Sequence, residues 1–146
     1  MTEQLVKTTS EDGIYTILLA RPDKRNAISD RLLAALEAAL VATPEGTRAI
    51  LLAGEGKHFC AGLDLSEHQH RDAFGTMLHS QSWHRIFARI QNGGIPVIAA
   101  LQGAVIGGGL ELATAAHIRV AEPSTIYQLP EGRHGIGNAG DGRIID

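Results

Sequence analysis

The chain has 146 residues, a length that suits a single domain with a buried core. Apolar residues make up 44% of it and charged residues 20%, as in ordinary globular proteins. The net charge of −3 and the aromatic content of 4% argue against nucleic-acid binding, which needs a basic face and side chains that stack on bases.

The first residues, MTEQLVKTTSEDG, are polar and contain no apolar core of a signal peptide. The longest apolar stretch, Ile95 to Ile106, is interrupted by polar and glycine residues and is shorter than the about 20 residues that cross a bilayer. A single cysteine, Cys60, cannot form an internal disulfide. We therefore expect a cytoplasmic protein that does not bind membranes or nucleic acid.

Short apolar runs alternate with helical patterns, which favours the α/β class. Two strands, Leu5–Thr8 and Ile14–Leu19, flank a turn signal at residues 11–13 and predict a hairpin. Ser29 is a good N-cap for a helix over residues 30–42. That helix places four leucines on one face: Leu32, Leu33, Leu36 and Leu40.

The rest of the chain repeats the same kinds of element. Residues 48–53 predict a buried strand, which a glycine-rich loop follows up to residue 62. Residues 72–90 have a helical pattern, and 96–101 predict a core strand. A triple glycine at 107–109 leads into a helix over 110–116, and 117–121 and 125–128 predict two further strands. A rough unit of strand, strand and helix therefore recurs.

Two loops could carry chemistry. In GKHFCAGLDLSE, residues 56–67, Gly62 permits backbone angles that would turn the Leu63 N–H into a cleft, although an ordinary strand-to-helix turn has the same pattern. In PVIAALQGAVIGGGLELA, residues 96–113, free N–H groups at the start of a helix would favour an oxyanion. Close packing of helix on strand also explains these glycines. The segment lacks the residues of a P-loop and the spacing of a dinucleotide fingerprint.

Two glutamates lie next to these loops. Glu111 stands in an apolar helical run, where a carboxylate could simply complement the helix dipole. Glu131 follows Pro130 and could be a solvated turn residue. Together with two oxyanion loops, the pair would supply an acid, a base and electrostatic stabilisation for proton transfer next to a carbonyl.

The remaining candidates favour structural roles. The seven histidines have no ligand-like spacing, so we expect surface or capping roles and no metal site. Cys60, between Phe59 and Ala61, is typical of a small buried side chain rather than a nucleophile. Trp83 is expected in the core or at an interface. No G-x-S-x-G motif of a hydrolase occurs.

Four ordered segments carry a family resemblance. HFCAGLDL, VIGGGLELA, the LPE step at 129–131 and RPDKRNAIS at 21–29 resemble the enoyl-CoA hydratase/isomerase, or crotonase, superfamily, over about residues 12–137. The resemblance implies a ClpP/crotonase spiral of ββα units. It implies that residues 1–146 form the N-terminal spiral domain, or an incomplete part of it, without the C-terminal helical region through which members assemble as trimers or hexamers.

The resemblance also implies roles for individual residues. The N–H groups of Leu63 and Gly108 would form an oxyanion hole for the thioester carbonyl, with Glu111 as base and Glu131 as acid. The substrate would be an acyl-CoA thioester, with no separate cofactor. Ser66 stands where the family often has a basic residue. The residues implied in binding the substrate and its coenzyme A part are Arg25, Ala27, Ala61, Leu63, Asp64, Leu65, Ser66 and Gly108.

The sequence leaves three functions open. The presence of two glutamates favours hydration of a 2-enoyl-CoA. A Δ3,Δ2-enoyl-CoA isomerase would need one glutamate to shuttle a proton and would add no water. A truncated, non-catalytic module that binds coenzyme A or takes part in assembly is the third alternative.

Overall fold

The computed structural model describes residues 3–68 and 71–130. In chain order, its elements are β1 (Val6–Glu11), β2 (Ile14–Leu19), a 3-10 turn (Pro22–Lys24), α1 (Asp30–Val41), β3 (Ala49–Gly54), α2 (Leu65–His68), α3 (Ala73–Asn92), β4 (Val97–Leu101), β5 (Ala104–Ile106), α4 (Gly108–Ala115), β6 (Ile118–Ala121) and β7 (Ile126–Gln128). The predicted hairpin, strands and helices are present, with ends that differ by up to three residues.

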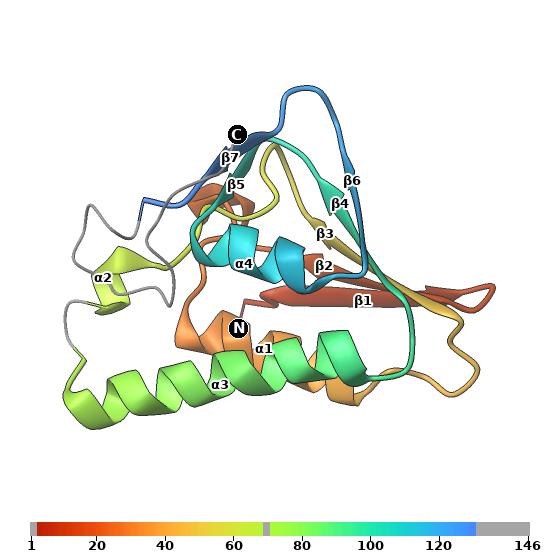
Figure 1. Ribbon diagram of the computed structural model, residues 1–146, viewed down its shortest axis with the longest axis horizontal. Coiled ribbons are helices and arrows are strands. Elements are labelled where there is room, and N and C mark those ends of the chain that lie inside the picture. The colour runs from red at the N-terminus through yellow and green to blue at the C-terminus, as the bar shows by residue number, and fades with distance from the viewer. Residues whose placement is uncertain (1–2, 69–70, 131–146) are drawn as a thin grey trace.

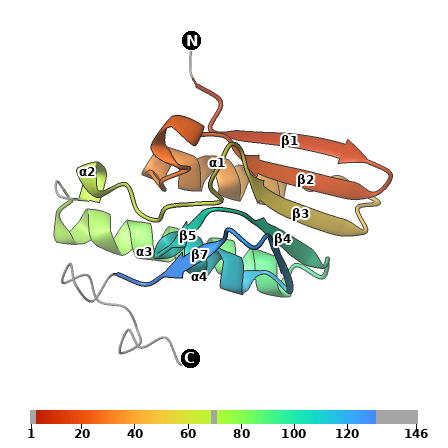
Figure 2. The same cartoon turned by 90° about the horizontal axis from the view of Figure 1, so that it is seen from above.

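The larger sheet has five strands in the order β1-β2-β3-β4-β6 (Figures 1 and 2). The β1–β2 pair is antiparallel, and its two-residue turn has positive φ at both Asp12 and Gly13, as a primed hairpin turn requires. All later pairs in this sheet are parallel. Parallel strands end at the same edge of a sheet, so the loops that follow β2, β3 and β4 gather there.

A second set of parallel pairings runs beside this edge. Strand β5 pairs with β7, Cys60 forms a bridge with Val105 in β5, and Ile28 forms a bridge with Leu63. The strands β4, β5 and helix α4 thus form one unit, and β6 and β7 begin the next. The strand-strand-helix unit expected from the sequence is confirmed by the order of the elements along the chain (Figure 1).

Helices α1 and α3 lie side by side along the larger sheet (Figure 1). The Ser29 hydroxyl caps α1 by accepting the N–H of Leu32 at 3.1 Å, and all four predicted leucines are buried. In β2, β3 and β4 the buried residues alternate along the strand, which is the pattern of one packed face. The Tyr15 hydroxyl reinforces this packing by donating to the carbonyl oxygen of Ala39 at 2.9 Å.

Helix α3 differs from the simple amphipathic pattern. Its second half buries Trp83, Ile86 and Ile90, as expected, but Phe74 and Met77 in its first half are 63% and 46% exposed. With 20 residues α3 is about 30 Å long, whereas the 12 residues of α1 extend about 18 Å. The first turns of α3 therefore extend past α1 (Figure 1).

Besides the 3-10 turn, two short elements are not predicted from the sequence. Strand β5 has three residues in a segment that reads as a glycine-bearing turn, and α2 is a single turn in a segment that reads as a polar loop. Both are too short for a periodic pattern, and tertiary contacts decide them. No helix in the described part of the chain is long and apolar enough to cross a membrane.

Candidate active site

Backbone hydrogen bonds join the loops of successive units into one edge. The Ile28 N–H donates to the Gly62 carbonyl at 2.7 Å, and the Asp64 N–H donates to the Ile28 carbonyl at 2.9 Å. The Cys60 carbonyl accepts the N–H of Ile106 at 3.0 Å. Segments 25–28, 60–64 and 104–109, far apart in the sequence, therefore lie next to one another.

The geometry of the Ile28 bridge sets the direction of the Leu63 N–H. The bridge uses the Gly62 carbonyl and the Asp64 N–H, and adjacent peptide groups of an extended segment point to opposite sides. The Leu63 N–H therefore points away from Ile28. It makes no hydrogen bond within residues 3–68 and 71–130.

Gly62 brings Leu63 close to the second predicted donor. Its φ of +91° lies in the region that favours glycine, and a Cβ at this position would be 2.8 Å from the Ile106 carbonyl oxygen and 3.6 Å from the Gly108 nitrogen. A larger residue would push the two loops apart. Both predicted oxyanion donors, Leu63 and Gly108, consequently lie where Gly62 packs against residues 106–108.

Gly108 is the first residue of α4, where an N–H has no acceptor within the helix. The Gly108 N–H donates no hydrogen bond to any of the described residues. The next residue, Gly109, packs so tightly on the Cys60 carbonyl that a Cβ there would collide with it. The helix start is thus held against segment 60–63, with the positive end of its dipole at Gly108.

Glu111 lies in the first turn of α4 and is half-buried. It comes three residues after Gly108, so both residues lie on the same side of the helix. Its backbone N–H donates to the Gly107 carbonyl at 3.0 Å, which fixes the turn that carries the carboxylate.

The second predicted glutamate, Glu131, lies outside the described residues. The chain that leads to it is described up to Pro130. The carbonyl of Gln128, at the end of β7, accepts the Gly107 N–H at 2.7 Å. Strand β7 therefore ends beside the glycine loop.

Apart from Gly108, the residues predicted to bind the substrate and its coenzyme A part come together on two adjacent segments, 25–27 and 61–66. Arg25 is exposed with a φ of +51°, and its carbonyl accepts the N–H of Ala61 at 3.0 Å. Ala27 and Ala61 are half-buried, whereas Leu65 and Ser66 are exposed at the start of α2.

Asp64 uses its carboxylate to connect these loops. It accepts from the Ser66 hydroxyl at 2.6 Å and from the Arg21 guanidinium at 2.8 Å. The hydrogen bond from the Ser66 hydroxyl, followed by that from Arg21, holds the pKa of Asp64 below its usual range. Asp64 is therefore ionised at neutral pH and braces the loop on which Leu63 lies.

Asn26 lies in the segment 25–27 that the resemblance places along the coenzyme A path, but its structural role was not identified from the sequence. It is fully buried, and its amide nitrogen donates to the carbonyls of Glu55 at 3.0 Å and His58 at 2.9 Å. Its amide oxygen accepts the Arg21 N–H at 2.8 Å. The signal was its place in RPDKRNAIS, because asparagine tolerates the left-handed conformation that Asn26 adopts at φ +55°.

Cys60, His58 and His117 have the structural roles expected of them, whereas His79 is not the surface residue that was expected, since its side chain is only 8% exposed. Burial raises the pKa of Cys60 to about 12, so its thiol is not a nucleophile near neutral pH. His58 and His117 accept the backbone N–H groups of Ala104 and Val97, each at 3.0 Å. The described residues contain no group of three or more side chains that could hold a metal ion.

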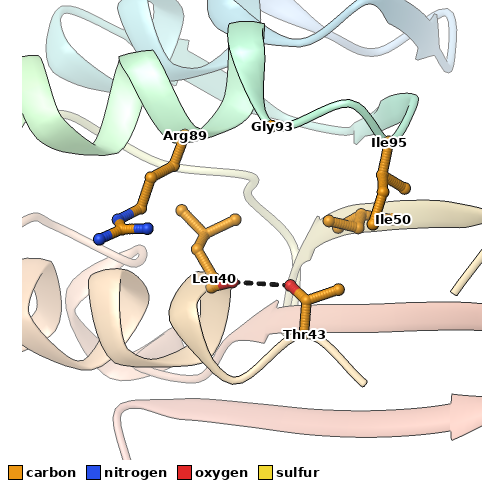
Figure 3. Close-up of a pocket in the computed structure, with 6 residues that line it drawn as sticks. All are labelled: Leu40, Thr43, Ile50, Arg89, Gly93 and Ile95. Carbon is orange, nitrogen blue, oxygen red and sulfur yellow. Dashed lines mark hydrogen bonds between the residues drawn. The ribbon is translucent and has the colours of Figure 1, made fainter. Parts of the chain in front are cut away.

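A cavity of about 150 Å³ lies elsewhere, between the ends of α1 and α3 and the start of β3 (Figure 3). It is lined by Leu40, Thr43, Ile50, Arg89, Gly93 and Ile95. Ligands of parallel sheets bind at the carboxyl ends of the strands, and this cavity lies at the amino ends. It is therefore separate from the edge that carries Leu63 and Gly108.

Comparison with known proteins identifies the family and the fold of this chain. The profile of the family described as enoyl-CoA hydratase/isomerase matches residues 9–144. The chain is 34% identical over 139 residues to a probable enoyl-CoA hydratase of Mycobacterium leprae, covering 90% of this chain and 53% of that protein. It is 37% identical over 138 residues to a probable enoyl-CoA hydratase of Bacillus subtilis, covering 91% and 54%.

Solved structures have the same fold. The enoyl-CoA hydratase of Thermoplasma volcanium superposes with a TM-score of 0.88 at 36% identity, covering 92% of this chain and 54% of that one. A crystal structure from Rhodopseudomonas palustris gives 0.86 at 56% identity, covering 91% and 52%. The chain spans about half the length of the relatives it matches, and its fold is the crotonase spiral. With the family profile matched over nearly its whole length, this chain belongs to the enoyl-CoA hydratase/isomerase family.

Proposed function

We propose that the chain carries the site for adding water across the 2,3 double bond of an enoyl-CoA thioester. The observation that carries the proposal is the meeting of two backbone donors, Leu63 and Gly108, at the start of the helix that bears Glu111. Membership of the enoyl-CoA hydratase/isomerase family supports the same substrate class.

In the proposed reaction, Glu111 accepts a proton from water as the water oxygen bonds to the β carbon. The electron pair of the double bond moves toward the thioester, and its carbonyl oxygen gains negative charge. Glu131 then delivers a proton to the α carbon as the carbonyl re-forms. The proton held by Glu111 returns to Glu131 by exchange with solvent, which restores both glutamates. One molecule of water is consumed, with its hydroxyl on the β carbon and a hydrogen on the α carbon.

The backbone donors would supply the electrostatic part of this catalysis. They are fixed by strand pairing and by tight packing, so they need no rearrangement when charge develops on the carbonyl oxygen. Loss of one such donor in other enzymes costs about 10²–10³ in rate. The positive end of the α4 dipole adds to the stabilisation at Gly108.

The coenzyme A part would lie along the two adjacent loops. Arg25 has an exposed, positively charged side chain. Ala27 and Ala61 have small side chains, which leave room for the coenzyme A part of the substrate. Leu65 and Ser66 would flank it at the start of α2. The carboxylate of Asp64 is engaged by Ser66 and Arg21, so we assign it to bracing the loop. No separate cofactor is required.

Hydration of crotonoyl-CoA by the chain, compared with its Glu111→Gln variant, tests the proposal. We expect kcat to fall by about 10²–10⁴, the usual contribution of a general acid or base. Glu45→Gln, an exposed glutamate in the loop after α1, is the matched control and should keep full activity.

Two results would contradict the assignment. Full hydration by Glu111→Gln would exclude Glu111 as the base, and full hydration by Glu131→Gln would exclude Glu131 as the acid. A 3-enoyl-CoA assayed in parallel separates hydration from isomerisation, because isomerisation moves a double bond without adding water.

Assembly and location belong to the proposal as well. The family resemblance implies a role in fatty acid metabolism, and implies a homotrimer or hexamer when the C-terminal helical region is present. The single, buried cysteine fits a cytoplasmic location. Sedimentation of a chain that includes the C-terminal helical region tests the assembly.

A further inference from the structure

Trp83 in α3 lies directly against the oxyanion loop. A Cβ placed on Gly108 would be 3.2 Å from Cζ2 of Trp83 and 3.4 Å from Cδ1 of Ile28. The indole is 8% exposed and packs at a tilt on Phe87, with ring centres 5.0 Å apart. The first residue of α4 therefore rests on the six-membered ring of this indole.

Hydrogen bonds hold the other side of the indole. The Trp83 Nε1–H donates to Nε2 of His79 at 2.9 Å. An indole nitrogen can only donate, so Nε2 of His79 carries a lone pair and the ring proton is on Nδ1. Nδ1 lies 3.0 Å from Oδ1 of Asp30 and donates to it.

Asp30 anchors this chain of hydrogen bonds. It is the first residue of α1, and its carboxylate also pairs with the guanidinium of Arg71. The side chain of His79 is only 8% exposed, so water competes little for its ring nitrogens. The chain Asp30–His79–Trp83 thus runs from the start of α1 to the contact with Gly108.

We propose that His79 is a positioning residue for the oxyanion hole. By fixing the indole of Trp83, it sets where Gly108 lies and hence where the Gly108 N–H points. The effect on catalysis rests on the function proposed above, whereas the placement of Gly108 does not. A small displacement of a donor is costly, because a misplacement of about 1 Å can reduce a rate about 10²-fold.

Two substitutions at one position separate the two hydrogen bonds of His79. In His79→Gln, the amide oxygen can take the place of Nε2 and still accept from Trp83. In His79→Asn, the shorter amide can keep the bond to Asp30 but cannot reach Trp83. His84→Asn, an exposed histidine on the same helix, is the control for loss of a histidine.

The single tryptophan gives a direct readout without substrate. In the ¹H–¹⁵N NMR spectrum of the 146-residue chain, one indole N–H signal belongs to Trp83. We expect His79→Asn to move this signal upfield and to displace the backbone amide signal of Gly108. His79→Gln and His84→Asn should leave both signals near their wild-type positions.

Crotonoyl-CoA hydration gives the second readout. We expect His79→Asn to lower kcat about 10-fold, less than the about 10²–10³ for complete loss of a donor, with little change in KM. His79→Gln should restore kcat to within about 2-fold of wild type.

The outcomes distinguish this inference from the proposed function. A Gly108 amide signal that stays in place in His79→Asn overturns the inference, as does an equal displacement in His79→Gln. If Gly108 moves as expected but the wild-type chain hydrates no crotonoyl-CoA, the positioning role stands and the proposed function fails. If the chain is active and Gly108 moves without a change in kcat, the catalytic part of the inference is wrong.

Discussion

Cys60 lies where segments 60–64 and 104–109, which carry the proposed donors Leu63 and Gly108, contact each other. Its backbone pairs with Val105, its carbonyl lies under Gly109, and its Sγ donates to the carbonyl of Asn26 at 3.2 Å. Cys60 is fully buried, so solvent does not stabilise a thiolate at this position. The residue type is explained by packing and by one hydrogen bond, not by reactivity.

Burial of Cys60 makes stability depend on pH in the alkaline range. Its pKa is raised from 9.0 to about 12 in the folded chain, so the folded thiol keeps its proton while the unfolded thiol loses it. Above about pH 9 the unfolded state binds fewer protons, and stability falls by about 1.4 kcal/mol for each pH unit up to the folded pKa.

Urea unfolding at several pH values between 8 and 11, for wild type and Cys60→Ala, measures this effect. The variant lacks the thiol, so the difference between the two free energies of unfolding should shrink as pH rises. A difference that stays constant over this range would contradict the raised pKa.

At the scale of elements, short segments build the site and long ones support it. Strand β5 has three residues, and segments 25–28 and 60–64 are held by isolated bridges and single hydrogen bonds. Helices α1 and α3 supply the buried face that keeps the sheet in place. The positions of the proposed donors Leu63 and Gly108 therefore depend on a few specific contacts between loops.

Asn26 is the residue whose loss should loosen these loops most. Asn26→Ala leaves three backbone groups without a side-chain partner, at about 1 kcal/mol each, so we expect the free energy of unfolding to fall by about 3 kcal/mol. Asn92→Ala, an exposed asparagine at the end of α3, should change it by less than about 0.5 kcal/mol. Urea unfolding of both variants tests this, and equal effects would show that the buried amide contributes nothing.

Some elements of this fold are predictable from the sequence alone, and others are not. The leucine face of α1 and the hairpin at residues 11–13 are predictable because both depend on local periodicity and turn chemistry. Strand β5 and the buried amide of Asn26 are not predictable in this way. Their hydrogen-bond partners are up to 46 residues away in the chain, so no local sequence pattern predicts the contacts.

At the scale of the whole molecule, the edge strands β6 and β7 carry exposed apolar side chains. Ile118 and Val120 in β6 are 53% and 60% exposed, and Ile126 and Tyr127 in β7 are 64% and 45% exposed. In the described residues both strands lie at the edge of their sheets. Exposed apolar edge strands are templates for further pairing.

We therefore expect the 146-residue chain to associate with itself through β6 and β7. Val120→Lys should lower the association measured by sedimentation, because a charged side chain blocks pairing at an edge. Val41→Lys, at the end of α1, is a matched control because Val41 is 59% exposed. Equal effects of the two variants would show that the association is nonspecific hydrophobic contact and not pairing at this edge.

The sequence by itself predicted the α/β class and the longer elements in their order, because periodicity and turn chemistry are local properties of the chain. The resemblance to a known family named Leu63, Gly108 and Glu111 as candidate site residues. Only the tertiary structure decided that segments 60–64 and 107–109 meet, that Asp64 is engaged by Arg21 and that Trp83 rests against Gly108. These facts depend on parallel pairing between distant segments. Parallel pairing brings together residues that no nearby sequence pattern connects.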